Sequence, residues 1–261
     1  MTLPSPFWSD ATTTLYQGDS LRILQALPTA SVDAVVTDPP YSSGGMTMSA
    51  RQAPTSSKYV LTGTKVQRPE FCGDNRDQRS FTLWASLWLA ECLRVTRPGG
   101  VLLSFIDWRQ LPSMTDAVQV GGWIWRGIVP WDKTEGVRPQ MGFFRAQCEY
   151  VITASNGPMG DQARTRRICM PGCFRESVHS REKLHITGKP VELMKRLLDI
   201  LPAGSTVLDP FAGSGTTLVA ARAMGMHSIG VEMTEEYAAI ARDRLAGTAT
   251  AVASATATAQ A

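Results

Sequence analysis

The sequence lacks any apolar run long enough to cross a bilayer. Its longest such stretch, 101–106, is far shorter than the roughly 20 residues that a membrane helix needs. The N-terminus has no basic patch followed by an apolar segment, so no secretory signal is expected. The five cysteines are scattered and odd in number, which argues against a disulfide scaffold and indicates a reducing compartment. We therefore expect a cytoplasmic protein with no membrane partner.

A strong charge of one sign is also missing. The net charge is +3, and the 43% of hydrophobic and 19% of charged residues are ordinary for a globular protein. Two segments, 42–80 and 156–184, nevertheless each hold six basic and three acidic residues. A solvated loop is the commoner explanation of such a segment, and contact with nucleic-acid phosphates is the functional one.

Short strands alternate with helical patterns along most of the chain. Strands are expected at 32–37, 101–106, 206–208 and 227–231, and helices at 84–95, 190–200, 216–224 and from Glu235. A turn at 97–100 is expected to end the first of these helices. The alternation predicts an α/β fold with a mainly parallel, doubly wound sheet covered on both faces. The tail 246–261 consists mostly of Ala, Thr, Ser and Gly, and we expect it to be disordered.

The sharpest C-terminal feature is a glycine-bearing turn between a strand and a helix. Such a turn brings the backbone close to a nucleoside cofactor at the carboxyl ends of a doubly wound sheet. The following strand delivers Glu232 and then Met233, where a carboxylate can bind ribose hydroxyls. The turn and its flanks comprise Asp209, Pro210, Phe211, Ala212, Gly213, Ser214, Gly215, Thr216 and Thr217.

Three nucleotide-binding motifs compete for this turn. A phosphate-binding P-loop needs a lysine, which the turn does not contain. A dinucleotide fingerprint needs a third glycine where Leu218 stands. A site for S-adenosylmethionine asks for Asp209 and a Phe-x-Gly-x-Gly turn, and both are present. The segment therefore favours the methyl donor as cofactor.

Asp38, Pro39, Pro40 and Tyr41 directly follow the first predicted strand. Two prolines after an aspartate commonly just end a strand. Chemistry offers a second reason, because the exocyclic amine of a base is a poor nucleophile. Hydrogen bonds accepted by the Asp38 carboxylate and the Pro39 carbonyl would make that nitrogen more nucleophilic, and Tyr41 would offer a flat face to a flipped-out base. Positioning and electrostatics would then supply the catalysis.

In this order the motifs resemble those of the DNA amino-methyltransferases of the permuted β class, over about residues 14–245. The resemblance rests also on 17–20, 88–105, 131–150 and 185–190. It implies one Rossmann-like methyltransferase domain at 1–245, in circularly permuted motif order. A DNA-side loop would lie at 42–80 and a small target-recognition insertion at 156–184. It further implies that Asp19, Asp38 and Lys189 lie against the cofactor, Lys189 within a His-x-x-x-Lys-Pro element. Because the two halves of the permuted chain supply different strands of one sheet, Asp38 and Asp209 are expected to meet at its carboxyl edge.

The resemblance implies a function as well: site-specific methylation of double-stranded DNA at N6 of a flipped-out adenine, by a bacterial or phage enzyme. In this family an aspartate at the position of Asp38 is more often associated with adenine, and cytosine N4 stays open as the alternative. RNA and protein-glutamine methyltransferases with similar loops usually have the unpermuted order. A homodimer is a family-level expectation only.

Two further features have competing interpretations. Cys169, Cys173, His179 and His185 could suggest zinc, but their spacing is loose and we assign no metal. Among the tryptophans, Trp84 and Trp88 lie on a helical apolar face and are expected in the core. Trp131 is the better candidate for a wall of the base-binding site.

Overall fold

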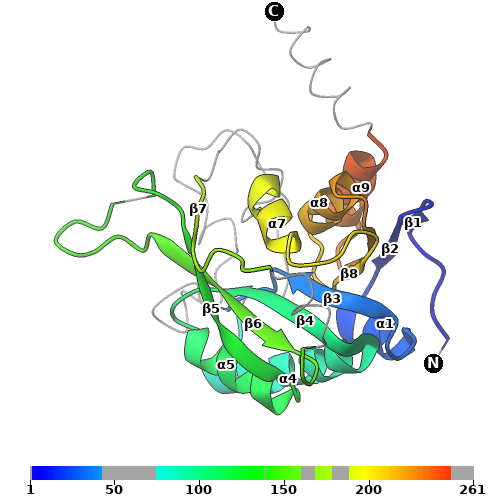
Figure 1. The fold of residues 1–261 in the computed structure, drawn as a ribbon, viewed down its shortest axis with the longest axis horizontal. Coiled ribbons are helices and arrows are strands. Elements are labelled where there is room, and N and C mark those ends of the chain that lie inside the picture. The colour runs from blue at the N-terminus through cyan, green and yellow to red at the C-terminus, as the bar shows by residue number, and fades with distance from the viewer. Residues whose placement is uncertain (1, 43–74, 138, 160–167, 178–187, 248–261) are drawn as a thin grey trace, which may run out of the picture.

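The computed structural model describes residues 2–42, 75–137, 139–159, 168–177 and 188–247 (Figure 1). Within these ranges, one sheet carries the strands in the order β1-β2-β9-β8-β3-β4-β6-β5-β7. The strands are β1 (Trp8–Ser9), β2 (Thr13–Gln17), β3 (Val32–Thr37), β4 (Thr96–Ile106), β5 (Ile124–Asp132), β6 (Cys148–Ser155), β7 (Phe174–Arg175), β8 (Thr206–Asp209) and β9 (His227–Glu232). The helices are α1 (Ser20–Ala26), α4 (Gln78–Val95), α5 (Leu111–Val120), α7 (Val191–Leu198), α8 (Thr216–Ala223) and α9 (Glu235–Leu245).

The centre of the sheet is parallel, as predicted. Strands β2, β9, β8, β3 and β4 pair in parallel with their neighbours. Strand β6 breaks the pattern, because it runs antiparallel to both β4 and β5. The antiparallel pairing brings the start of β6 to the edge where the parallel strands end.

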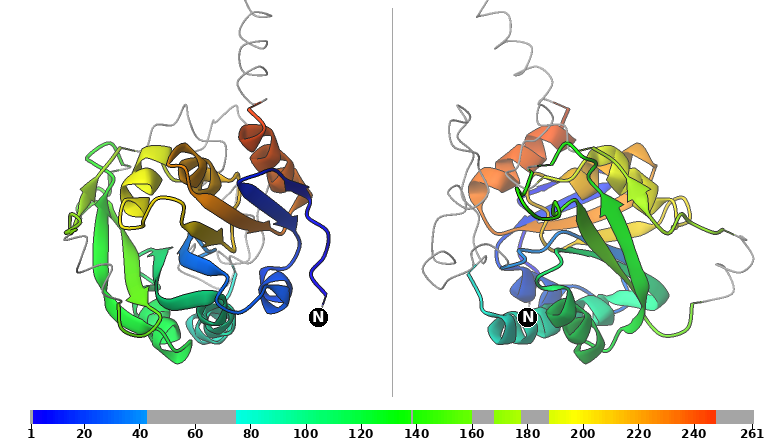
Figure 2. Two further views of the ribbon diagram at one scale, coloured as in Figure 1. Left: turned by 45° about the vertical axis from the view of Figure 1, so that its right-hand side comes forward. Right: turned by 90° about the vertical axis from the view of Figure 1, so that its left-hand side faces the viewer.

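Helices cover both faces of the sheet, as the alternating side chains of its strands require. In β4, Leu102 and Ile106 point into a core shared with α1, α4 and α5, whereas Leu103 and Phe105 point into one shared with α7 and α8. Figure 2 shows these two helical layers on opposite sides of the sheet, with α9 beside α8. The doubly wound architecture expected from the sequence is confirmed.

A topological switch point lies between β8 and β3. From β8 the chain passes through α8 to β9 on one side, and from β3 it leads by way of α4 to β4 on the other. The two strands pair in parallel, with Ala34 opposite Val207 and Val35 opposite Leu208. Ligands of open α/β sheets bind outside the carboxyl ends of the strands at such a point. The predicted catalytic loop after β3 and the predicted cofactor turn after β8 therefore meet there.

Several boundaries differ from the prediction. Helix α4 begins at Gln78 rather than 84, because the Asp77 side chain caps it by accepting from the Ser80 backbone, so 78–80 are helical and not loop. The predicted turn at 97–100 is part of β4, where a bulge shifts the pairing with β3. Gly100 fits there because a Cβ would lie 2.5 Å from Thr96 Cγ2. Helix α7 starts after Pro190, its N-cap, and ends at Leu198, before 200.

Parts of three expected segments lie outside the described residues. These parts are 43–74 of the DNA-side loop, 160–167 and 178–184 of the target-recognition region, and 248–261 of the tail. The described part of the predicted target-recognition region includes β7, whose Phe174 is buried in the core beside α7. No helix among the described residues is long and apolar enough to cross a membrane.

Candidate active site

The predicted catalytic loop leaves β3 at the carboxyl edge of the sheet. Thr37, the last residue of the strand, is fully buried, and its hydroxyl donates to Asp209 Oδ1 at 2.7 Å. Asp38 comes next and is half-buried, while Pro39 is buried. This bond links the ends of β3 and β8 and places the Asp38 loop beside the cofactor turn, as the sequence predicted for Asp38 and Asp209.

Both carboxylate oxygens of Asp38 have a partner. Lys189 Nζ lies 2.6 Å from Oδ2, and the Tyr41 hydroxyl donates to Oδ1 at 2.5 Å. The Lys189 side chain is only 5% exposed. Burial raises the pKa of Asp38 and the neighbouring Glu149 raises it further, whereas Lys189 opposes both by favouring the charged carboxylate. Lys189, expected against the cofactor, thus also contacts the predicted catalytic group.

Glu149, at the start of β6, extends this cluster. Its Oε2 lies 3.2 Å from Lys189 Nζ and accepts from the Tyr41 hydroxyl at 3.3 Å, while its Oε1 lies 3.1 Å from Lys133 Nζ. Burial would raise the pKa of Glu149, but the two lysines outweigh it and hold this pKa at about 2. Negative and positive groups therefore alternate in the order Asp38, Lys189, Glu149 and Lys133, which we call the charge chain. Alternation keeps each buried charge paired.

Aromatic rings surround the Lys189 ammonium group. The ring centroids of Tyr41 and Phe105 each lie 5.2 Å from Nζ, and that of Trp131 lies 6.0 Å away. Trp131 is 2% exposed, packs edge-on against Phe105 and donates its indole hydrogen to the Glu176 carbonyl. It therefore supports the site from inside the core, which corrects its predicted role as a wall of the base-binding site.

The turn after β8 has the geometry of a backbone cradle. Gly213 and Gly215 have φ angles of +52° and +79°, and Gly215 is the N-cap of α8. The Gly213 amide donates to Glu232 Oε2 at 2.9 Å, and Glu232 Oε1 accepts from the Thr234 amide and hydroxyl. A positive φ strains any residue with a Cβ, so glycine suits both positions, and the missing side chains let a ligand approach the backbone closely.

The other predicted cofactor residues lie along the same edge. Asp209 is 2% exposed, and burial raises its pKa to about 6 in spite of hydrogen bonds from Thr217, Thr37 and the Phe211 amide. Asp19 is exposed at the N-cap of α1, where it accepts from the Arg22 amide. The Pro210 carbonyl accepts a hydrogen bond from the Ser20 hydroxyl, and Arg244 donates to the Ser214 carbonyl and to the Thr216 hydroxyl. Ala212 is buried, whereas Met233 is 46% exposed.

Phe211 joins the turn to α4. Its ring lies 5.5 Å from that of Trp84 and 5.1 Å from that of Trp88 between centroids. Trp88 is buried and Trp84 is partly buried, so both belong to the core, as predicted. The buried indole nitrogen of Trp88 has no hydrogen-bond partner within the described residues, which places an unsatisfied donor beside the cofactor turn.

Comparison with known proteins identifies the family. A family model described as DNA methylase, for N6 and N4 methyltransferases, matches residues 32–243, most of the chain. The chain belongs to the DNA methylase family. The type II methyltransferase M.HpaI of Haemophilus parainfluenzae is 24% identical over 249 residues, which cover 87% of this chain and 72% of the relative.

Solved structures share the fold of this DNA methylase. The PvuII DNA methyltransferase, which is cytosine-N4-specific, matches with a TM-score of 0.65 and 18% identity over 90% of this chain and 87% of its own. M1.HpyAVI, in a complex with S-adenosylmethionine, matches with a TM-score of 0.62 and 21% identity over 89% and 98% of the two chains. The Rossmann-like methyltransferase fold expected from the sequence is thus confirmed.

Sequence reasoning missed two members of the charge chain of this methylase. Lys133 and Glu149 lie in a segment that resembles the family, but the sequence alone assigned neither a role of its own. A usable signal was present, since Glu149 stands near the start of a strand that continues as Val151, Ile152 and Ala154. A charged residue next to an apolar strand is costly to bury without a partner and therefore indicates a paired or functional site.

The described residues offer no group of three or more His, Cys, Asp or Glu side chains that could hold a metal ion. Cys169 and Cys173 are exposed, while His179 and His185 lie outside the described residues. The structure therefore adds no support to the zinc interpretation.

One prediction concerns the cradle. Gly215→Ala is expected to lower the free energy of unfolding of the methylase by about 1–2 kcal/mol, because a Cβ is strained at φ +79° and would lie 3.0 Å from Ala241 Cβ. Urea denaturation measures the effect. Gly172→Ala is the control, since a Cβ at that position would have nothing within 4 Å, and it should change little. Equal stability of the two variants would contradict the cradle geometry.

Proposed function

We propose that this DNA methylase transfers a methyl group from S-adenosylmethionine to the exocyclic N6 amine of a flipped-out adenine in double-stranded DNA. The observation that carries the proposal is Asp38, a carboxylate held at the end of β3 and joined through Thr37 and Asp209 to a glycine cradle. The preference for adenine rests on the resemblance that an aspartate implies at this position. Cytosine N4 remains the alternative target, and RNA or protein glutamine is a less favoured substrate.

The residues present fit the proposed cofactor. The cradle at Gly213 and Gly215 lets the backbone approach closely, Glu232 offers a carboxylate to ribose hydroxyls, and Phe211 adds an aromatic face. The likeness to the M1.HpyAVI complex supports the same cofactor. When bound, S-adenosylmethionine supplies an electrophilic methyl group on a sulfonium. The cation at the sulfonium also suits an edge that holds Asp38, Asp209 and Glu232.

Asp38 and Pro39 would act on the nucleophile. The base amine donates its hydrogens to the Asp38 carboxylate and the Pro39 carbonyl, which leaves the nitrogen lone pair free to attack. Because these acceptors are fixed in a partly buried site, they stabilise the positive charge that develops on nitrogen without reorganising. The Asp38 carboxylate can accept the amine beside the hydrogen bond that it already receives from Tyr41, because each of its oxygens has two lone pairs. The Tyr41 ring would offer a flat face to the base.

The test is identification of the methylated nucleoside. Purified protein is incubated with S-adenosylmethionine and unmethylated DNA, which is then digested to nucleosides and analysed by mass spectrometry. N6-methyladenine is the expected product, and sequencing of the methylated DNA gives the recognition site. N4-methylcytosine as the product would support the same mechanism but show that the target base is cytosine. Absence of any methylated base in DNA, with cofactor binding intact, would overturn the proposal and move the search to RNA and protein substrates.

A further inference from the structure

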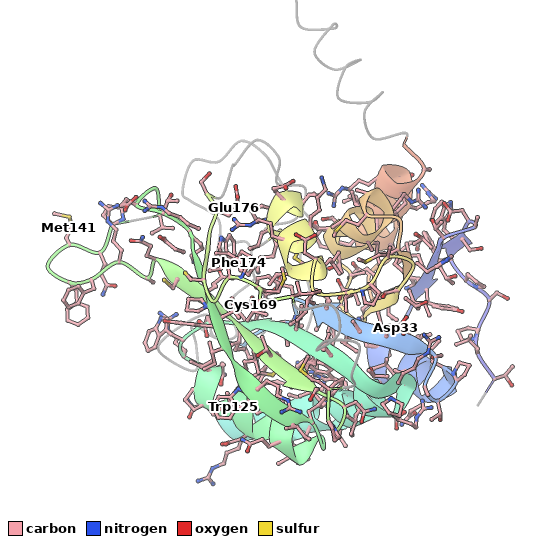
Figure 3. The ribbon with its side chains drawn as sticks, viewed as in Figure 1. Asp33, Trp125, Met141, Cys169, Phe174 and Glu176 are labelled. Carbon is pink, nitrogen blue, oxygen red and sulfur yellow. The ribbon has the colours of Figure 1, made fainter. Side chains whose placement is uncertain are left out.

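The connection between β5 and β6 carries three large apolar side chains in solvent. Met141 is 90% exposed, Phe143 72% and Phe144 83%. We call these three residues the apolar tip. In Figure 3, Met141 stands at the far end of a projection that extends away from the sheet. The rings of Phe143 and Phe144 lie 5.4 Å apart between centroids in an edge-on arrangement. Adjacent apolar side chains this exposed indicate a binding surface.

The apolar tip is built on the catalytic network. At the base of the projection, the Lys133 amide donates to the Gln147 carbonyl at 3.0 Å, and the Gln147 side chain donates to Asp132 at 2.6 Å. Lys133 also pairs with Glu149, which reaches Asp38 through Lys189. The two strands at the base of the projection are therefore bonded to each other and, through Lys133, to the charge chain. This connection fixes the position of the projection relative to the Asp38 loop.

The turn that carries the apolar tip is hydrogen-bonded and is followed by a basic residue that suits DNA. Gly142, at φ +74°, turns the chain between Met141 and Phe143, and the Phe143 amide closes that turn on the Gln140 carbonyl at 3.1 Å. Arg145 follows the tip and bonds the Glu135 carbonyl across the projection. An apolar end followed by a basic residue matches the chemistry of a duplex, which presents stacked bases inside and phosphates outside.

We propose that the apolar tip enters the base stack of DNA beside the target and fills the space that the flipped base leaves. This inference rests on the proposed function, since only an enzyme that extrudes its base creates the gap. Extrusion costs the stacking and pairing energy of the target base. Aromatic side chains recover part of this cost, because stacking on a base contributes about 1–3 kcal/mol for each base.

Self-association with a second copy of the chain explains the apolar tip less well than insertion into DNA does. Two phenylalanines bury about 150–250 Å² each. Their sum is well below the roughly 800 Å² per partner of a standard protein interface. A wedge between bases needs no such area, because a single inserted side chain suffices to hold a base step open.

The test uses the double variant Phe143→Ser, Phe144→Ser and a duplex with the recognition site found in the methylation experiment. 2-Aminopurine at the target, or pyrrolocytosine where the target is cytosine, reports extrusion by its fluorescence. We expect the double variant to lose most of the fluorescence rise and about 10–100-fold in kcat/KM, corresponding to one or two stacked bases. Val120→Ser, at a side chain that is 71% exposed on α5, is the control and should behave as wild type.

Rescue separates this role from a structural one. With an abasic site opposite the target, the base is already loosened, and the double variant should regain a rate within about 3-fold of wild type, because little extrusion cost remains. Wild-type fluorescence and rates in the double variant would overturn the wedge while leaving the proposed function intact. A wild-type dimer that the double variant turns into a monomer would assign the tip to self-association instead. A wild-type protein that methylates no DNA would defeat the proposed function itself.

Discussion

Asp38→Asn is expected to lower the rate of methyl transfer by about 10²–10³-fold, the usual cost of removing one fixed electrostatic group from an active site. The amide retains one acceptor oxygen but loses the negative charge that favours a developing cation. It also directs either its NH2 group or a weaker oxygen at Lys189, whose ion pair with Glu149 remains. Single-turnover kinetics at saturating cofactor measure the chemical step directly.

The control for this prediction is Asp116→Asn, at an exposed position on α5. It makes the same chemical change far along the chain from the catalytic loop and should leave the rate unaltered. Binding of S-adenosylmethionine to the Asp38 variant should stay within about 3-fold of wild type, a free-energy change below 1 kcal/mol, because the cradle is intact. A fully active Asp38→Asn variant would exclude a charged acceptor, whereas a variant that fails only in cofactor binding would assign Asp38 to the cofactor alone.

The parts of the site that sequence could predict are those set by local pattern. Strand β3 ends at Thr37 as expected, because a β-branched run stops at two prolines. The meeting of Asp38 and Asp209 also followed from sequence, because parallel strands end at one edge of a sheet whatever the chain order. The Thr37 bond to Asp209 shows how close that meeting is.

What could not be predicted depends on long-range pairing. Glu149 reaches Lys189 because β6 runs antiparallel beside β4, so that its first residues lie at the carboxyl edge of a strand that ends at Ile106. No local period encodes that neighbour. Trp131 illustrates the same limit, since an aromatic residue in a strand is equally compatible with a wall or a core position, and only the packing of Phe105 against it decides.

The charge chain solves a problem that the proposed chemistry creates. A carboxylate used as a hydrogen-bond acceptor must be ionised, yet burial raises the pKa of Asp38. Lys189 counters this effect. Burial alone would lower the pKa of Lys189, but Asp38 and, to a lesser extent, Glu149 keep it raised. Lys133, the last member of the charge chain, forms an ion pair with Glu149. Each charge therefore stabilises the charged form of the next, and Asp38 receives a fixed cation that is itself shielded from solvent.

Lys189→Met is expected to reduce kcat at pH 7 by about 10²-fold, because it leaves two partly buried carboxylates without the cation between them. In the proposed mechanism the active form of Asp38 is the carboxylate, so we expect activity to be lost as pH falls through its pKa. Removing Lys189 raises that pKa, so the loss sets in at a higher pH than in wild type, and raising the pH restores part of the rate. A pH profile of kcat at saturating cofactor measures both effects.

The same profile decides between the two roles of Lys189. If Lys189 acts through Asp38, the Met variant changes kcat and its acid limb, and Lys189→Arg, which retains the charge, recovers much of the rate. If it serves the cofactor alone, as the sequence resemblance implied, KM for S-adenosylmethionine rises while kcat and its pH dependence stay unchanged. Lys195→Met, on the helix α7 that follows, is the control, since that side chain is 36% exposed and pairs only with Glu192 among its described ion pairs. The 2.6 Å contact between Lys189 and Asp38 favours a role of Lys189 through Asp38. A charge-assisted hydrogen bond of this length fixes the position of the carboxylate and also stabilises its negative charge.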